Sequence, residues 1–175
     1  ANDFWRGVKL NYKNALQTAL FFLVILTLCT TMINMADLTL VANTSLAGFR
    51  RVWLNVSKAI SYVTVALAAL MSLWMLALGV NYKQKFFQMV RNSFLLTIGT
   101  FPQTIFFAVL ALLPFVLFLI PGSLFVVIAV FMVLLFAFAY LLLVWLDYAQ
   151  WAFDKFINPK IQGAKVGRGI YNKED

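Results

Sequence analysis

The sequence predicts an all-α fold: a polytopic integral membrane protein with a bundle of four transmembrane helices and amphipathic interfacial helices. Its composition is 63% hydrophobic and 11% charged, whereas soluble domains contain about half apolar and about a quarter charged residues. The stretch 103–146 contains no charged residue and no histidine. It is about twice the length of roughly 20 residues that a helix needs to cross a bilayer. We therefore expect a transmembrane domain over residues 1–158 and a polar tail over 159–175.

The chain begins with an amphipathic segment over residues 4–14. Phe4, Val8 and Tyr12 recur every four residues, so they share one face of a helix. The bases that fall on another face are Arg6, Lys9 and Lys13. This pattern is typical of a helix that lies in the lipid headgroup region. A basic cytoplasmic lead-in to a first span has the same composition, and we favour that interpretation.

The first span is expected over residues 15–36, with Asp37 closing it. Its later half carries polar side chains at spacings of three and four, namely Thr27, Thr30, Thr31 and Asn34. A polar path through the membrane would give the same pattern. However, threonine hydroxyls can bond to their own helix backbone, and no ionisable residue accompanies them. We therefore favour a face that packs against another helix.

The second span is expected over residues 59–80, after a more polar segment, 38–57, that we expect to be a loop. Ala68 and Ser72 lie four residues apart in this span, which is a spacing that lets two helix backbones approach closely. The segment 81–92 that follows carries lysine and arginine but no acid.

Residues 86–101 predict a helix that enters the membrane obliquely and ends at Pro102, where the backbone must break or kink. The third span is expected over 103–120. Pro114 lies within it, and a kink without functional meaning is a commoner role for such a proline than a hinge.

The dipeptide Pro121–Gly122 predicts a tight turn at the membrane surface, because proline lacks an amide donor and glycine relaxes the backbone. The fourth span is then expected over 123–146. The aromatic residues expected at its membrane interface are Trp145, Tyr148 and Trp151.

The basic residues predict the topology. Lysine and arginine number 14 against six acids. With a cytoplasmic N-terminus, only Arg50, Arg51 and Lys58 fall outside the cell, as the positive-inside rule favours. We therefore expect a multi-pass protein of the plasma membrane with both termini in the cytoplasm. The basic surplus is thus explained by the membrane, and we expect no nucleic-acid partner.

Few side chains in the sequence are of the kinds that catalyse reactions or bind metals. The sequence has no histidine and one cysteine, Cys29, so the usual metal-ligand sets are missing and we expect no metal or cofactor. The acids beside the spans are Asp37 and Asp147, which we expect to be solvated helix caps. No ionisable residue is expected at mid-membrane, where proton-coupled transport would need one. The sequence therefore predicts a protein that is not an enzyme.

Two segments carry a resemblance to a known family. Residues 3–38, DFWRGVKLNYKNALQTALFFLVILTLCTTMINMADL, combine an FW start and spaced bases with a span that ends near Asp37-Leu38. The segment VRNSFLLTIGTFPQTIFFAVLAL has an Ile-Gly pair at Ile98-Gly99 and a proline, Pro102, before the next span. These features resemble the YesL-like family of bacterial membrane proteins. Members usually have two further spans before the FW segment, so we expect Ala1 not to be the natural start of the family architecture.

The resemblance implies a function that the residues alone do not. Such proteins are encoded beside carbohydrate ABC importers in Gram-positive bacteria, so we expect a non-catalytic accessory subunit that assists the assembly, stability or coupling of an importer. The alternative is a stand-alone or oligomeric membrane transporter or channel for a small solute. We expect the lipid bilayer and the importer's permease subunits to be the partners. The basic and aromatic residues expected to meet a partner or lipid are Phe4, Trp5, Arg6, Lys9, Lys13, Lys83, Lys85 and Arg91.

Overall fold

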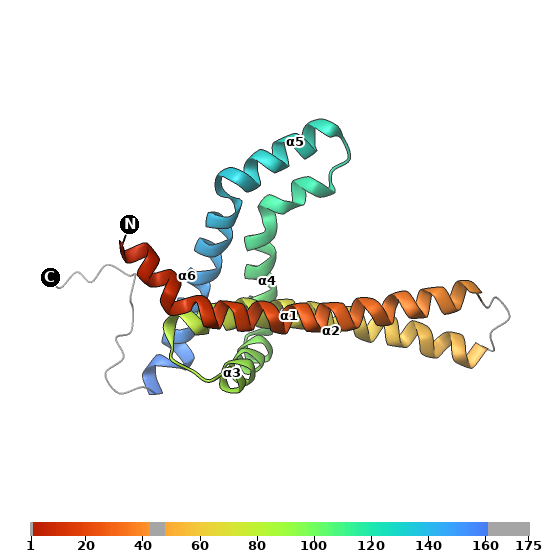
Figure 1. The fold of residues 1–175 in the computed structure, drawn as a ribbon, viewed down its shortest axis with the longest axis horizontal. Coiled ribbons are helices and arrows are strands. Elements are labelled where there is room, and N and C mark those ends of the chain that lie inside the picture. The colour runs from red at the N-terminus through yellow and green to blue at the C-terminus, as the bar shows by residue number, and fades with distance from the viewer. Residues whose placement is uncertain (1, 43–47, 161–175) are drawn as a thin grey trace. The chain divides into compact units, whose positions relative to one another are not determined.

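The computed structural model describes residues 2–42 and 48–160, and every regular element in these ranges is helical (Figure 1). The elements are α1 (Asn2–Ala42), α2 (Gly48–Asn81), α3 (Phe86–Gly99), α4 (Phe101–Leu112), η1 (Leu113–Leu119), α5 (Ser123–Met132), η2 (Val133–Ala137), α6 (Phe138–Phe156) and η3 (Asn158–Lys160). The elements η1 and η3 are 3₁₀-helices, and η2 is a π-helical turn between α5 and α6. The all-α prediction is confirmed. The expected tail lies almost wholly outside the described residues.

The chain divides into two compact units, Ala1–Thr100 and Phe101–Asp175. In the first unit α1 and α2 form a long antiparallel pair, and α3 packs against α2 (Figure 1). The α1 helix continues from the expected interfacial segment into the expected first span without a break. Residues 8–42 contain neither proline nor glycine, so nothing in them interrupts the backbone hydrogen bonds.

The prediction of a loop over 38–57 is wrong at both ends. Helix α1 extends to Ala42 and α2 begins at Gly48, and residues 43–47 lie outside the described part of the chain. The start of α2 carries apolar side chains at helical spacings of three and four, namely Phe49, Val52, Trp53 and Val56. The prediction relied on the polar residues in the middle of this segment and overlooked the helical spacing of these four apolar residues.

Helices α1 and α2 approach each other closely at Gly79. The Asn14 side-chain amide donates a hydrogen bond of 2.9 Å to the Gly79 carbonyl oxygen. A Cβ atom at position 79 would lie 3.0 Å from the Asn14 Cβ and 3.5 Å from the Met89 sulfur. Only glycine therefore fits here without displacing a neighbour. We call this contact between Asn14 and Gly79 the clasp.

A second polar contact joins α1 and α2 nearer to their connection. The Lys58 ammonium group forms a salt bridge with the Asp37 carboxylate. The two side chains are 23% and 49% exposed, respectively, so water screens the pair and its contribution to stability is small.

In the second unit, α5 packs against η1 and α6 packs against α4. The predicted break at Pro121–Gly122 lies between η1 and α5, and Gly122 has a φ of 134° that favours glycine. Pro102 lies in the first turn of α4, where its missing N–H does no harm. At Pro114 the α-helix gives way to the 3₁₀-helix η1, because proline cannot donate to the preceding turn.

Aromatic rings hold α4 and α6 together. The Tyr148 ring stacks on Phe107 with centroids 4.3 Å apart, and its hydroxyl lies 3.1 Å from the Thr104 hydroxyl. Trp145 and Tyr148 are buried, while Trp151 is 46% exposed. Of the three aromatic residues expected at a membrane interface, only Trp151 therefore presents a large exposed surface.

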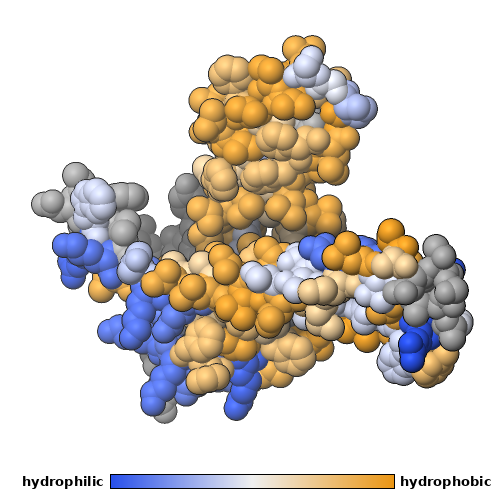
Figure 2. Space-filling view, turned by 45° about the vertical axis from the view of Figure 1, so that its right-hand side comes forward, coloured by the Kyte–Doolittle hydropathy of each residue, from blue (hydrophilic) through white to orange (hydrophobic). Residues whose placement is uncertain are grey.

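Among the residues that the structure describes, three helical stretches are long and apolar enough to cross a membrane: Lys9–Ala42, Gly48–Asn81 and Ser123–Lys160. The interrupted pair of α3 and α4 adds a fourth only if it counts as one broken span. Apolar residues cover much of the surface of both units (Figure 2). The helix lengths and the apolar surface are thus compatible with a multi-pass membrane protein, and the expected third span over 103–120 stays a prediction.

Substitution of Gly79 tests the clasp. We expect Gly79→Leu to lower the free energy of unfolding by about 1–3 kcal/mol, the usual cost of overpacking, because its side chain would collide with Asn14. The control is Gly99→Leu, since a Cβ at Gly99 meets no atom within 4 Å. Thermal unfolding in detergent measures both, and equal destabilisation would contradict a tight α1–α2 contact.

A double-mutant cycle tests the salt bridge. We expect Asp37→Lys and Lys58→Asp each to lower the melting temperature and the exchanged pair to recover part of the loss, with a coupling of about 0.2–1 kcal/mol. Asp147→Lys combined with Lys58→Asp is the control, because Asp147 is exposed and belongs to the second unit. Zero coupling between positions 37 and 58 would show that the contact does not form.

Candidate functional site: a basic cleft beside an apolar groove

A cleft of about 590 Å³ lies in the first unit, between α1 and the segment that connects α2 to α3. We call it the basic cleft. Its lining consists of three lysines, four side-chain amides and one phenylalanine: Lys13, Asn14, Gln17, Lys83, Gln84, Lys85, Phe86 and Gln88. None of the described residues that line it is a carboxylate, so the charge of this described lining is wholly positive.

The clasp places these distant residues together. Lys13 precedes Asn14 in α1, and Lys83 follows Gly79 by one helical turn. The Tyr82 amide still donates to the Leu78 carbonyl oxygen over 2.8 Å, so α2 keeps its helical geometry up to this point. The bond between Asn14 and Gly79 therefore brings bases from both ends of the unit's sequence to one place.

Amide side chains fix the connection between α2 and α3. The Gln88 side-chain oxygen accepts a 3.2 Å hydrogen bond from the Lys85 backbone N–H and so caps the start of α3. The Asn92 amide donates to the Gln84 side-chain oxygen over 3.1 Å. The backbone is thereby held in place while the lysine side chains stay available to a ligand.

The three ammonium groups have no carboxylate near them in the part of the chain that the structure describes. The side chains of Lys13, Lys83 and Lys85 are exposed, and none of them forms a salt bridge with another described residue. Their charges lie beside the N-terminal end of α3, whose backbone dipole is also positive. The cleft is therefore suited to a phosphate or carboxylate group.

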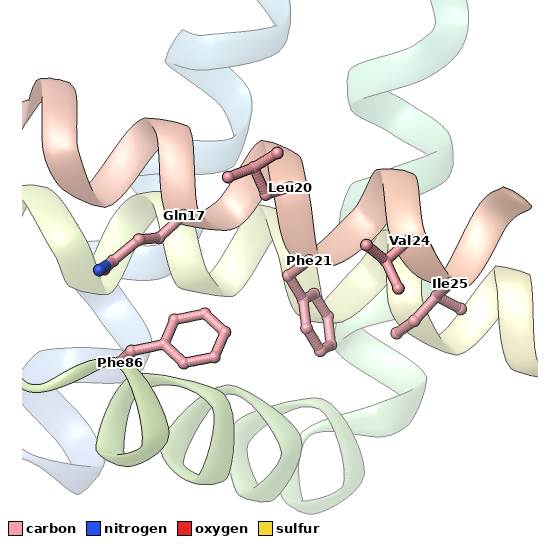
Figure 3. A pocket seen from close by; sticks show the side chains of 6 residues that line it. All are labelled: Gln17, Leu20, Phe21, Val24, Ile25 and Phe86. Atoms are coloured by element: carbon pink, nitrogen blue, oxygen red, sulfur yellow. The ribbon is translucent and has the colours of Figure 1, made fainter.

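An apolar groove of about 450 Å³ continues from the cleft along α1 (Figure 3). Its lining is Gln17, Leu20, Phe21, Val24, Ile25 and Phe86. Gln17 and Phe86 belong to the linings of both the cleft and the groove. Figure 3 shows Phe86 of α3 directed toward Phe21 of α1, and the two rings meet edge to face with centroids 6.4 Å apart. One continuous site thus changes from polar to apolar along α1.

The structure brings together three of the residues predicted to meet a partner or lipid, namely Lys13, Lys83 and Lys85. Another three line a separate hollow of about 400 Å³ with Leu10 on the N-terminal part of α1: Trp5, Arg6 and Lys9. Arg91 is exposed on α3 and lines neither the cleft nor the groove. The side chain of Phe4 lies outside the described part of the chain.

Sequence reasoning missed the amides of the cleft and the apolar groove. Gln17, Leu20, Phe21 and Val24 follow the spacing i, i+3, i+4 and i+7 of one helix face, which was a usable signal. Gln17, the polar residue at the start of this apolar face, lies where the polar cleft meets the apolar groove. The contact of this α1 face with Phe86 depends on the turn after α2, so the spacing of apolar residues in the sequence could not predict it.

The polar face predicted in the first span is exposed in the structure. The Thr27 and Thr31 hydroxyls each donate to a backbone carbonyl one turn earlier, over 2.8 Å, and Thr30 does the same. Asn34 is exposed, and its amide makes no hydrogen bond to any described residue. We call Thr27, Thr30, Thr31 and Asn34 the polar face of α1. No helix of the described chain covers it.

The residues considered for catalysis do not form a cluster. Asp37 pairs with Lys58, whereas Asp147 is exposed on α6. Within residues 2–42 and 48–160, no group of three His, Cys, Asp or Glu side chains could hold a metal ion. Comparisons with protein-family models, curated proteins and solved structures found no match to this chain.

Proposed function

We propose that this chain is a non-catalytic accessory subunit of a carbohydrate ABC importer in a bacterial plasma membrane, as its resemblance to the YesL-like family implies. The observation that carries the proposal is the polar face of α1. These side chains lie in a helix that is long and apolar enough to cross a membrane, and they are exposed on its surface. A second helix would cover them in the assembled complex.

The energetics of the bilayer favour such a partner. An amide without a hydrogen-bond partner is costly in hydrocarbon, where no water can replace the missing bond. The three threonines form hydrogen bonds within α1, whereas Asn34, close to the expected end of the span, forms none to a described residue. A backbone carbonyl or polar side chain of a permease helix would satisfy the Asn34 amide, and the small threonines would allow close approach.

The proposed orientation places both chain termini in the cytoplasm. It requires α3 and α4 together to act as one broken span, so that the chain crosses the membrane an even number of times. The basic cleft then lies at the cytoplasmic boundary, where lysine is favoured. An accessory subunit whose basic cleft lies there could influence the coupling of the importer from the cytoplasmic side.

The alternative is an oligomeric transporter or channel for a small solute. The same polar face favours it, since several copies could turn their threonine and asparagine side chains toward a common path. Solute flux into liposomes that contain only this protein would support this alternative. It would also count against the accessory role, because an accessory subunit alone should leave the liposomes impermeable.

Co-purification from native membranes tests the accessory role. We expect the permease subunits to accompany the tagged chain, and Thr27→Leu/Thr31→Leu/Asn34→Leu to weaken the association about 3- to 30-fold, as the loss of an interhelical hydrogen bond would. The matched control is Thr64→Leu, because Thr64 is an exposed threonine that bonds its own helix on α2. Purification without any permease subunit, or equal losses in the triple variant and the control, would contradict the proposal.

A further inference from the structure

We propose that the basic cleft and the apolar groove together bind one anionic phospholipid, with its phosphate among Lys13, Lys83 and Lys85 and one acyl chain along α1. This site does not depend on the importer as partner. It rests only on the arrangement of α1, α2 and α3, and on the placement of α1 in a bilayer.

The charge of the cleft selects an anion. Three lysines line it without a carboxylate, and they have no salt-bridge partner in the described chain. The N-terminal turn of α3 adds a positive backbone dipole next to Lys85. A zwitterionic lipid would place a second positive charge close to these lysines, whereas an anionic headgroup brings only the phosphate and neutral hydroxyls.

The amides of the cleft suit the rest of a headgroup. Figure 3 shows the Gln17 side chain extended toward the start of α3, at the junction of cleft and groove. An amide in this position can donate to an ester carbonyl or accept from a glycerol hydroxyl. It therefore occupies the depth at which the polar part of a phospholipid ends and its acyl chains begin.

The groove distinguishes a lipid from a soluble phosphate compound. Its lining is apolar apart from Gln17, and it follows α1 from Gln17 to Ile25, a distance of about 12 Å at 1.5 Å per residue. A free phosphate or sugar phosphate would leave this length of groove empty. An acyl chain would fill it and cover Phe21 and Phe86.

The position of the site along the helix agrees with a membrane boundary. The stretch of α1 with the length and composition of a span begins at Lys9 and ends at Ala42. Lys13 lies near its start, and the groove residues lie further along it. The cleft is therefore at headgroup depth when the groove is at acyl-chain depth, which is the order that a phospholipid in the bilayer presents.

Binding of a fluorescent phosphatidylglycerol to the purified full chain tests the proposal. The protein is held in phosphatidylcholine nanodiscs, and energy transfer from its tryptophans reports the labelled lipid. We expect Lys13→Gln/Lys85→Gln to weaken binding about tenfold or more, since two headgroup contacts are lost. Arg50→Gln/Arg51→Gln removes the same charge from the opposite end of α2 and should leave binding unchanged. Equal loss in both variants would show general attraction to basic protein and overturn the site.

The acyl-chain part of the proposal is tested separately. Val24→Phe should fill the groove and weaken phosphatidylglycerol binding at least about tenfold, while glycerol phosphate at millimolar concentration should not displace the labelled lipid. Leu20→Phe provides a second variant, since both positions are more than half exposed and tolerate bulk. Unchanged lipid binding in both folded variants, or displacement by glycerol phosphate or inorganic phosphate, would show a headgroup-only site and overturn the proposal. A folded variant is one whose gel-filtration profile matches that of the unmodified protein.

Discussion

The contact between Asn14 and Gly79 determines what the first unit can do. It is one of two polar contacts described between these helices, and it requires the absence of a side chain at position 79. Because the α1 and α2 backbones meet here, the bases that follow α2 lie beside the bases of α1. The basic cleft is therefore a consequence of one close helix approach, and a bulkier residue at position 79 would separate its walls.

The distribution of polar groups in this chain is compatible with a bilayer environment. Threonine hydroxyls within the long helices donate hydrogen bonds to backbone carbonyls of their own helix. In the second unit, the Tyr148 ring stacks on Phe107 and its hydroxyl lies beside the Thr104 hydroxyl. Among the ionisable groups, Asp37 pairs with Lys58, and the lysines of the cleft are exposed. The exposed amide of Asn34 makes no hydrogen bond to a described residue, which is why the proposed partner is placed against it.

The sequence predicted the features that depend on local composition. Long apolar runs require helix in a bilayer, and Pro121–Gly122 can only interrupt one, so the helical fold and this break could both be foreseen. The loop expected over 38–57 was wrong at its ends because average polarity outweighed helical spacing at Phe49 and Trp53. The clasp could not be predicted, since Asn14 and Gly79 are 65 positions apart. Lys13, Lys83 and Lys85 were selected as bases near a membrane surface, but their convergence depends on that contact.

The central claim is that lipid surrounds the α1–α2 pair and that its cleft faces the cytoplasm. Single cysteines introduced on a Cys29→Ser background test this in intact cells with a membrane-impermeant thiol reagent. Lys85→Cys should react only after the cells are permeabilised, and Arg50→Cys should react without this treatment. Val63→Cys should stay unreacted in both states, although its side chain is 60% exposed on the protein, because only lipid protects it. Ready labelling of position 63 in either state would contradict the account.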